Sequence, residues 1–237
     1  MAWTAVFTED WVGDNGDPWD SGRWTVGLVG AGATADIQTN RGRMSASTSF
    51  NEVNATSSVG TLDAVAIDYT IEFPTTDDQW SLTSFFHDGL WSGERPNNAY
   101  AFEVRPSGAR LRLYKFINGD RSTIREIPTF SLTAATPYSV RIECEPDGAT
   151  NNIRIKIWEA GTTEPGAWTI DEADSDLSSG GVGVSYMSGT AAGADEVFYN
   201  DFVVYEDAAA VIPVPNITAV TAQSSTELQV TWEDGVA

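Results

Sequence analysis

The chain has 237 residues, of which 41% are hydrophobic, with 21 Gly and 10 Pro. This length suits one large domain, or one domain and a fragment, and the spread glycines and prolines favour many short strands joined by turns. Acidic residues outnumber basic ones by 34 to 13, and a field of that sign repels nucleic acid and anionic membranes, so we expect neither as a partner.

Four runs along the chain alternate apolar and polar residues with a period of two, which is typical of antiparallel sheets packed on one face. They are 65–73, 109–116, 138–145 and 152–158. Turn signals separate them at Pro106-Ser107-Gly108, Asn118-Gly119-Asp120 and Pro146-Asp147-Gly148. The spacing predicts an all-β, two-sheet antiparallel sandwich over residues 4–206, with fewer than about 10% of residues in helix.

Two segments lack the alternation. Residues 74–98 form the longest non-alternating polar stretch, and we expect loops at the sandwich edge there. The acidic segment 171–178 is expected to be loop, with one short helical turn as the alternative.

Cysteine and histidine are each represented once. Cys144 rules out an intramolecular disulfide, and its place in the run 138–145 predicts a buried side chain. His87 has no Cys or His nearby in the sequence, so neither a zinc site nor a Ser-His-Asp triad is predicted.

The amino-acid composition changes after residue 206. Residues 207–215 are rich in Ala and Pro and read as a linker. Residues 216–237 resemble the first two strands of a fibronectin type III domain, with Ile217 and Val220 on the first strand and Val230 and Trp232 on the second. The domain prediction is therefore a sandwich over 1–206, a linker and an incomplete second β domain.

Three stretches of the first domain resemble the concanavalin A-like lectin/glucanase superfamily, in the jelly-roll form found in bacterial surface proteins and bacteriophage minor tail proteins. They are 7–24, 136–168, and 180–186 leading to 197–206. The resemblance implies the fold more than the function, because this fold hosts lectins, glycanases and inert spacers alike.

The start Met1-Ala2-Trp3-Thr4 has no signal-peptide features, and no transmembrane segment is evident. Together with the absence of disulfides, the resemblance implies a virion, phage tail-associated protein made in a host cytoplasm. Its expected partners are a host cell-surface polysaccharide and other tail proteins in an oligomeric assembly. An extracellular, bacterial cell-surface carbohydrate-binding module is the alternative.

Laminarinase-like hydrolases of this superfamily carry an acid ladder, E-x-D-x-E, on one strand. The nearest run here, 66–72, offers only Asp68 and Glu72. Their Cα atoms would lie roughly 13 Å apart at ~3.3 Å per residue, whereas a retaining pair needs about 5.5 Å between carboxyl groups. We therefore predict no enzyme and no catalytic residues, with a glycan-active hydrolase as the alternative.

Jelly-roll modules often bind a structural calcium ion between their first and last strands. Glu9, Asp10 and Asp201 are the matching acids here, and the loop Asp14–Asp17 is a second oxygen-rich candidate. The alternative is that these are surface acids of a very acidic protein.

The candidate glycan site comprises Trp80, His87, Asp88 and Trp91, because exposed tryptophans beside amides and carboxylates are typical of sugar recognition. The alternative is that one or both tryptophans plug the edge of the sandwich. A basic stripe on outward strand positions predicts either a cross-strand ion-pair ladder or a patch for acidic glycans. The stripe consists of Arg105, Arg110, Arg112, Arg141, Arg154 and Lys156.

Overall fold

The computed structural model describes residues 2–47, 50–93, 95–189 and 195–208 in full, and residues 216–224 and 227–233 as backbone strands. The regular elements of these ranges are β-strands, and they include no α-helix. No helix of the described part is long and apolar enough to cross a membrane. The all-β prediction is therefore confirmed.

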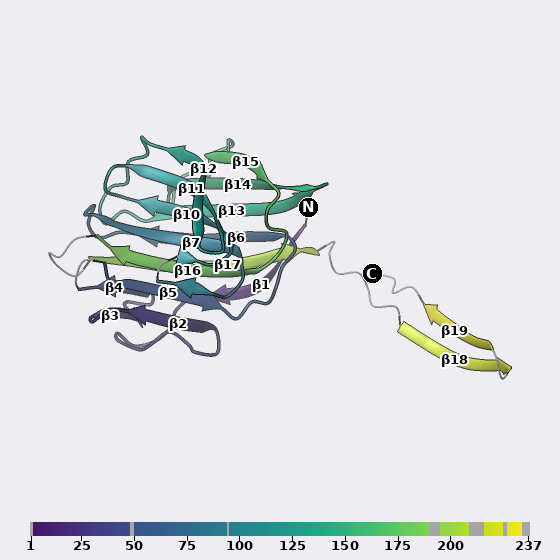
Figure 1. Ribbon diagram of the computed structural model, residues 1–237. Helices are drawn as coiled ribbons and strands as arrows, with labels where there is room; N and C mark the ends of the chain where they lie inside the picture. Colours follow the sequence, from purple (N-terminus) through teal and green to yellow (C-terminus); the bar gives the residue numbers. More distant parts are fainter. Residues whose placement is uncertain are drawn as a thin grey trace.

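Two antiparallel sheets, which we call sheet A and sheet B, pack face to face (Figure 1). The spatial order in sheet A is β15 (Ile170–Asp174), β14 (Thr150–Glu159), β13 (Tyr138–Asp147), β6 (Val65–Glu72), β17 (Asp195–Asp207), β4 (Gly42–Ala46) and β3 (Ala33–Ile37), while β1 (Trp3–Glu9) also pairs with β17. The order in sheet B is β12 (Asp120–Ile127), β11 (Arg110–Ile117), β10 (Ala99–Arg105), β7 (Gln79–His87), β16 (Gly181–Ser188), β5 (Glu52–Ser57) and β2 (Trp24–Val29). A short pair, β8 (Trp91–Ser92) and β9 (Arg95–Pro96), follows β7.

The core lies between the sheets, where alternate residues of each strand meet. In β6 the inward residues are Val65, Ile67, Tyr69 and Ile71, all at most 3% exposed, as the alternation predicts. Cys144 is also buried, and burial raises the pKa of its thiol. The core clusters aromatic rings where β1 and β2 meet β17. These rings belong to Phe7, Trp11, Trp19, Trp24, Tyr199 and Phe202.

The structure corrects two predictions of loop. Segment 74–98 contains β7, which lies in the middle of sheet B, and segment 171–178 begins with the edge strand β15. Strand β7 has buried side chains on both faces, so its sequence carries no apolar–polar alternation to detect. Strand β15 buries only Ile170 fully among its five residues, and a single apolar residue gives no period.

Strands β18 (Asn216–Ser224) and β19 (Glu227–Glu233) form an antiparallel pair with Val220 opposite Val230. Most of the predicted linker, 209–215, lies outside the described residues. The fibronectin type III assignment and the domain boundaries stay predictions.

Candidate functional site

The candidate site lies on the outer face of sheet B, the face turned away from sheet A. Strand pairing aligns the outward side chains of this face in rows that run across the strands. The first row contains Arg110, Arg105, Trp80 and Met187; the second contains Glu126, Arg112, Glu103, Leu82, Ser185 and Asn54; the third contains Thr123, Tyr114, Ala101, Ser84, Gly183 and Thr56.

The segment 88–98, which includes β8 and β9, folds over one part of this face. The amide of Asn54 donates to the Gly93 carbonyl over 2.9 Å. At the other end of the segment, the Gly119 N–H donates to the Asn97 carbonyl over 2.8 Å. The segment therefore extends from the turn that follows β11 to strand β5.

Trp91, which belongs to this segment, is half-buried and its ring is held in place. The indole Nε1–H donates to Thr56 Oγ1 over 2.8 Å, and the ring centroid lies 4.4 Å from that of His87. Gly183 makes the close approach possible, because a Cβ at this position would lie 2.8 Å from Trp91 Cζ2.

His87 is only 3% exposed, and its ring packs against the ring of Trp91. Its Nδ1 accepts a hydrogen bond from the Gly89 N–H over 2.8 Å, while Nε2 has no hydrogen-bond partner among the described residues. Burial lowers the pKa of His87 to about 4, which the nearby Asp88 carboxylate only partly counters. The imidazole is therefore neutral at neutral pH.

Asp88 organises the segment through three hydrogen bonds. Its carboxylate accepts from the Leu90 N–H at 3.0 Å and from the side-chain amides of Asn97 at 2.9 Å and Asn98 at 2.8 Å. Burial alone would raise the pKa of Asp88, but these hydrogen bonds outweigh it and lower the pKa. The Asp88 oxygens are thus engaged within the protein.

Trp80 lies on the same face of sheet B as Trp91 but at a different place on it. It is half-buried, and the Arg105 guanidinium lies 4.9 Å from its ring centre. Trp91 rests against Gly183, which pairs with Ser84, so Trp80 lies four strand positions away, or ~13 Å. The structure brings His87, Asp88 and Trp91 together and leaves Trp80 apart from them on the same face. Neither tryptophan belongs to the core between the sheets.

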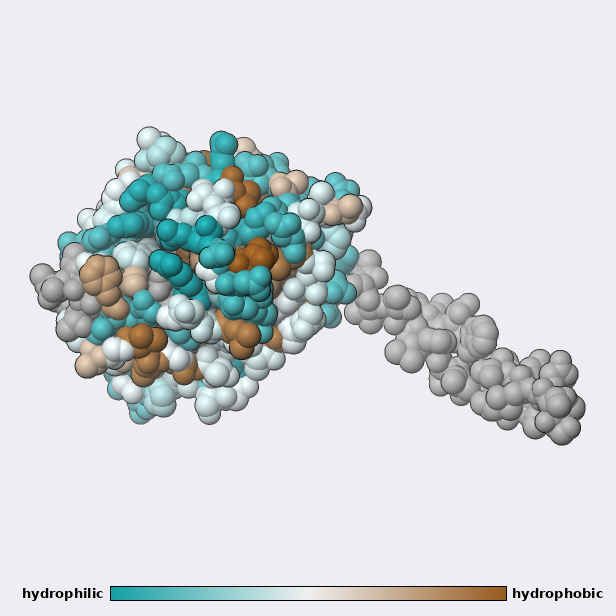
Figure 2. All heavy atoms as spheres, in the orientation of Figure 1, coloured by the Kyte–Doolittle hydropathy of each residue, from teal (hydrophilic) through white to brown (hydrophobic). Residues whose placement is uncertain are grey.

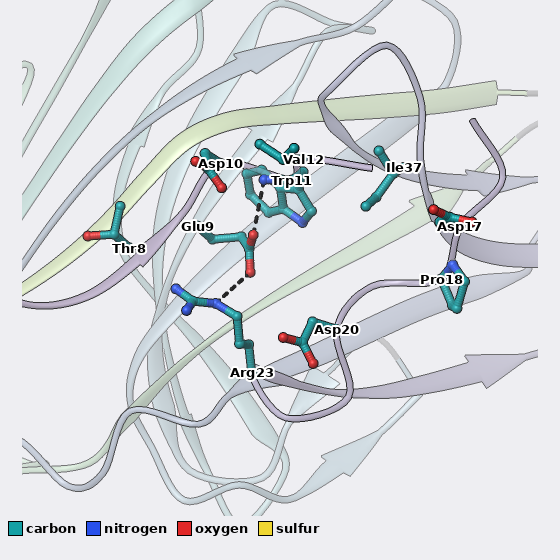
Figure 3. Close-up of a pocket in the computed structure, with 10 residues that line it drawn as sticks. All are labelled: Thr8, Glu9, Asp10, Trp11, Val12, Asp17, Pro18, Asp20, Arg23 and Ile37. Carbon is teal, nitrogen blue, oxygen red and sulfur yellow. Dashed lines mark hydrogen bonds and ion pairs between the residues drawn. The ribbon is translucent and has the colours of Figure 1, made fainter. Parts of the chain in front are cut away.

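Two of the acids proposed for calcium, Glu9 and Asp10, line a separate hollow of about 620 Å³ (Figure 3). Both carboxylate oxygens of Glu9 are occupied: Oε1 accepts from the Trp11 N–H at 3.0 Å, and Oε2 accepts from Arg23 at 2.9 Å and from the Trp24 indole at 3.2 Å. A guanidinium in this position repels a cation, so Glu9 does not fit a calcium ion.

The other two acids do not complete a metal site either. Asp201 accepts a hydrogen bond from its neighbour Asn200 and lines different hollows from Asp10. Across the residues that the structure describes, no group of three or more His, Cys, Asp or Glu side chains could hold a metal ion.

The two acids of the incomplete ladder in β6 are both engaged in ion pairs on the outer face of sheet A. Asp68 forms a bidentate pair with Arg141, with both N–O distances at 2.9 Å, and Glu72 pairs with Arg41 at 2.8 Å. Because their oxygens are engaged by a guanidinium, these carboxylates are not free to turn toward a substrate.

On sheet A the basic stripe forms the predicted cross-strand ladder. Arg154 pairs with Glu143 at 2.7 Å and with Glu145 at 2.8 Å, and Lys156 pairs with Glu164 at 2.8 Å. On sheet B, Arg112 also pairs across strands with Glu126 and Glu103, and Arg105 and Arg110 lie in the row that contains Trp80.

Comparisons with known proteins identify the fold. No protein-family model matches the chain, and no curated protein does. Among solved structures, a carbohydrate-binding module from Bacillus subtilis is 18% identical with a TM-score of 0.53, covering 76% of this chain and 94% of that one. A Bacillus licheniformis β-glucanase (12%, TM-score 0.58) and winged bean acidic lectin in complex with methyl-α-D-galactose (11%, TM-score 0.53) each cover 86% of this chain and 99% of theirs. The chain thus has the lectin/glucanase jelly-roll fold.

Proposed function

We propose that this protein is a non-catalytic glycan-binding module of a phage tail, and that it binds a host cell-surface polysaccharide on the outer face of sheet B. The observation that carries the proposal is the pair Trp80 and Trp91. Both rings lie on one face, outside the core, and are fixed by neighbouring polar groups. Aromatic rings flanked by hydrogen-bonding side chains suit sugars, whose C–H faces stack while their hydroxyls form hydrogen bonds.

The surface supports a polar ligand over an apolar one. The side of the molecule seen in Figure 2 is mainly hydrophilic, with hydrophobic groups confined to small patches. Such a surface offers no broad apolar area for a protein partner. The solved structures of this fold include lectins and a carbohydrate-binding module, which agrees with a glycan ligand.

The absence of catalysis is part of the proposal. It rests on the ion pairs that hold Asp68 and Glu72, since neither acid is available as nucleophile or proton donor. A β-glucanase shares the fold, so release of reducing ends from a β-glucan, lost in Asp68→Asn, would favour the hydrolase alternative.

The test is binding by Trp80→Ala and Trp91→Ala to an array of purified bacterial capsular and O-antigen polysaccharides. A stacked ring contributes ~1–3 kcal/mol by analogy with base stacking, so each variant should bind roughly ten- to a hundredfold more weakly. Trp158→Ala, on sheet A, is the control and should bind normally. Unfolding temperatures separate lost binding from lost structure, and unchanged binding in both variants would refute the site.

A further inference from the structure

Four arginines gather on the β10–β12 half of the outer face of sheet B, beside Trp80. Arg105 belongs to β10, Arg110 and Arg112 to β11, and Arg121 to β12. Pairing places Arg105 opposite Arg110, and the Arg121 guanidinium lies 4.7 Å from the centre of the Tyr114 ring. These groups form a basic patch on a chain whose formal charge is −21.

Carboxylates neutralise only part of this patch. Arg112 pairs with Glu126 at 2.9 Å and lies 3.5 Å from Glu103, while Arg105 pairs with Asp78. Arg110 and Arg121 have no carboxylate within ion-pair distance in the part of the chain that the structure describes. Four guanidinium groups therefore face three carboxylates. Arg121 is exposed to an incoming anion, while Arg110 is half-buried and its Nε has no hydrogen-bond partner among the described residues.

Glu103, the acid at the centre of the patch, is buried. Glu103 is 3% exposed, and this burial raises the pKa of its carboxyl group although Arg112, Arg105, Arg121 and Arg110 all oppose the shift. Because its carboxyl group is buried among these arginines, Glu103 cannot itself contact a ligand at the surface. Asp78 and Glu126 are more exposed than the arginines with which they pair, so the positive charge of the patch that no ion pair neutralises lies at Arg110 and Arg121.

The arginines are spread along the strands. Arg110 and Tyr114, over which Arg121 lies, are four positions apart in β11, or ~13 Å. A single small anion cannot contact both ends of such an array. A polymer with charges at intervals can, while its sugar rings contact Trp80.

Resting on the proposed function, we propose that this face selects polysaccharides that carry anionic groups at intervals, such as uronate carboxylates or phosphodiesters. Guanidinium groups recognise both anions by charge-assisted hydrogen bonds. Trp80 contacts the sugar ring, and the arginines make binding of charged polysaccharides tighter than binding of neutral ones.

The experiment measures binding of the full chain to hyaluronan and to its carboxyl-reduced form, and to phosphorylated dextran and dextran. We expect tighter binding of an anionic probe than of its neutral counterpart, with the preference lost at about 1 M NaCl, where the Debye length is about 3 Å. The two pairs of probes distinguish a uronate source from a phosphate source.

Arg121→Ala should weaken binding of the anionic probe by roughly two- to fivefold, the range of an exposed ion pair, and leave neutral binding unchanged. Arg125→Ala is the matched control, because Arg125 lies on the same strand but reaches Glu172 of sheet A. Equal loss in both variants would show an effect of net charge and overturn the inference.

Four other outcomes are also decisive. Equal, Trp80-dependent binding of charged and neutral probes would overturn this inference alone. Failure to bind either anionic probe would also overturn this inference. Polysaccharide binding that is unchanged in Trp80→Ala and Trp91→Ala would overturn the proposed function. Arg121-dependent binding of single-stranded DNA with equal affinity would replace the glycan by a nucleic acid.

Discussion

His87 shows how one residue couples the candidate site to pH. Its imidazole is enclosed by Trp91 and by the backbone of Gly89, and Nδ1 accepts a hydrogen bond, so the neutral ring already fills its place. Adding a proton would bury a charge without a second partner for it. The stack that positions Trp91 thus depends on His87 remaining neutral.

We expect stability to fall as the pH drops from about 6.5, the pKa of a free histidine, to about 4, the pKa of folded His87. The folded pKa is the lower one, so the unfolded chain takes up the proton first. The loss should approach ~2–3 kcal/mol near pH 4. Denaturant unfolding of the wild type and of His87→Gln between pH 7 and pH 4 gives the free energy of unfolding at each pH. The loss follows from the difference between the two proteins in the slope of that free energy against pH. Parallel pH profiles would contradict the buried neutral ring.

At the scale of elements, Glu9 links the two sheets. It ends β1 in sheet A, and its carboxylate accepts a hydrogen bond from the indole of Trp24, which begins β2 in sheet B. The same carboxylate fixes Arg23 and the turn at Trp11. Its role is therefore to satisfy donors at the junction of the sheets.

Glu9→Ala should lower the free energy of unfolding by about 2–4 kcal/mol, because it leaves buried donors and a partly exposed guanidinium without their acceptor. Asp10→Ala, which removes an exposed neighbour with no such bonds, should change stability by less than about 0.5 kcal/mol. Chemical denaturation measures both. A wild-type melting temperature that rises with millimolar calcium and falls with EDTA would instead support the metal assignment.

How much could be predicted differs among elements. Strands β6, β11, β13 and β14 have one buried and one polar face, and the period of two located each of them. Strand β7 escaped detection because both of its faces are buried. Trp80 and Trp91 were predicted as sugar-binding residues from the polar composition of the segment 74–98 that contains them. Phe86, which precedes His87, has a positive φ at a register shift between β7 and β16, a local backbone feature with no sequence signature here.

At the scale of the whole molecule, the strands of the sandwich pair among themselves between Trp3 and Asp207. Strands β18 and β19 pair only with each other within the described strands. A protein truncated after residue 208 should therefore melt within about 2 °C of the full chain, since its paired strands and core are intact. Differential scanning calorimetry tests this expectation. A drop of several degrees would show that the C-terminal segment packs against the sandwich.

The strand order also has a kinetic consequence. Strands β1 to β5 join the middle of either sheet only through β16 and β17, since β5 pairs with β16, and β1 and β4 pair with β17. Strand β2 can pair early with β5, and β3 with β4, but a ribosome must release almost the whole sandwich before these strands can join the middle of either sheet. Such non-local pairing makes folding slow and leaves unpaired edges open to aggregation. Newly made chains should consequently depend on chaperones until residue 207 has emerged.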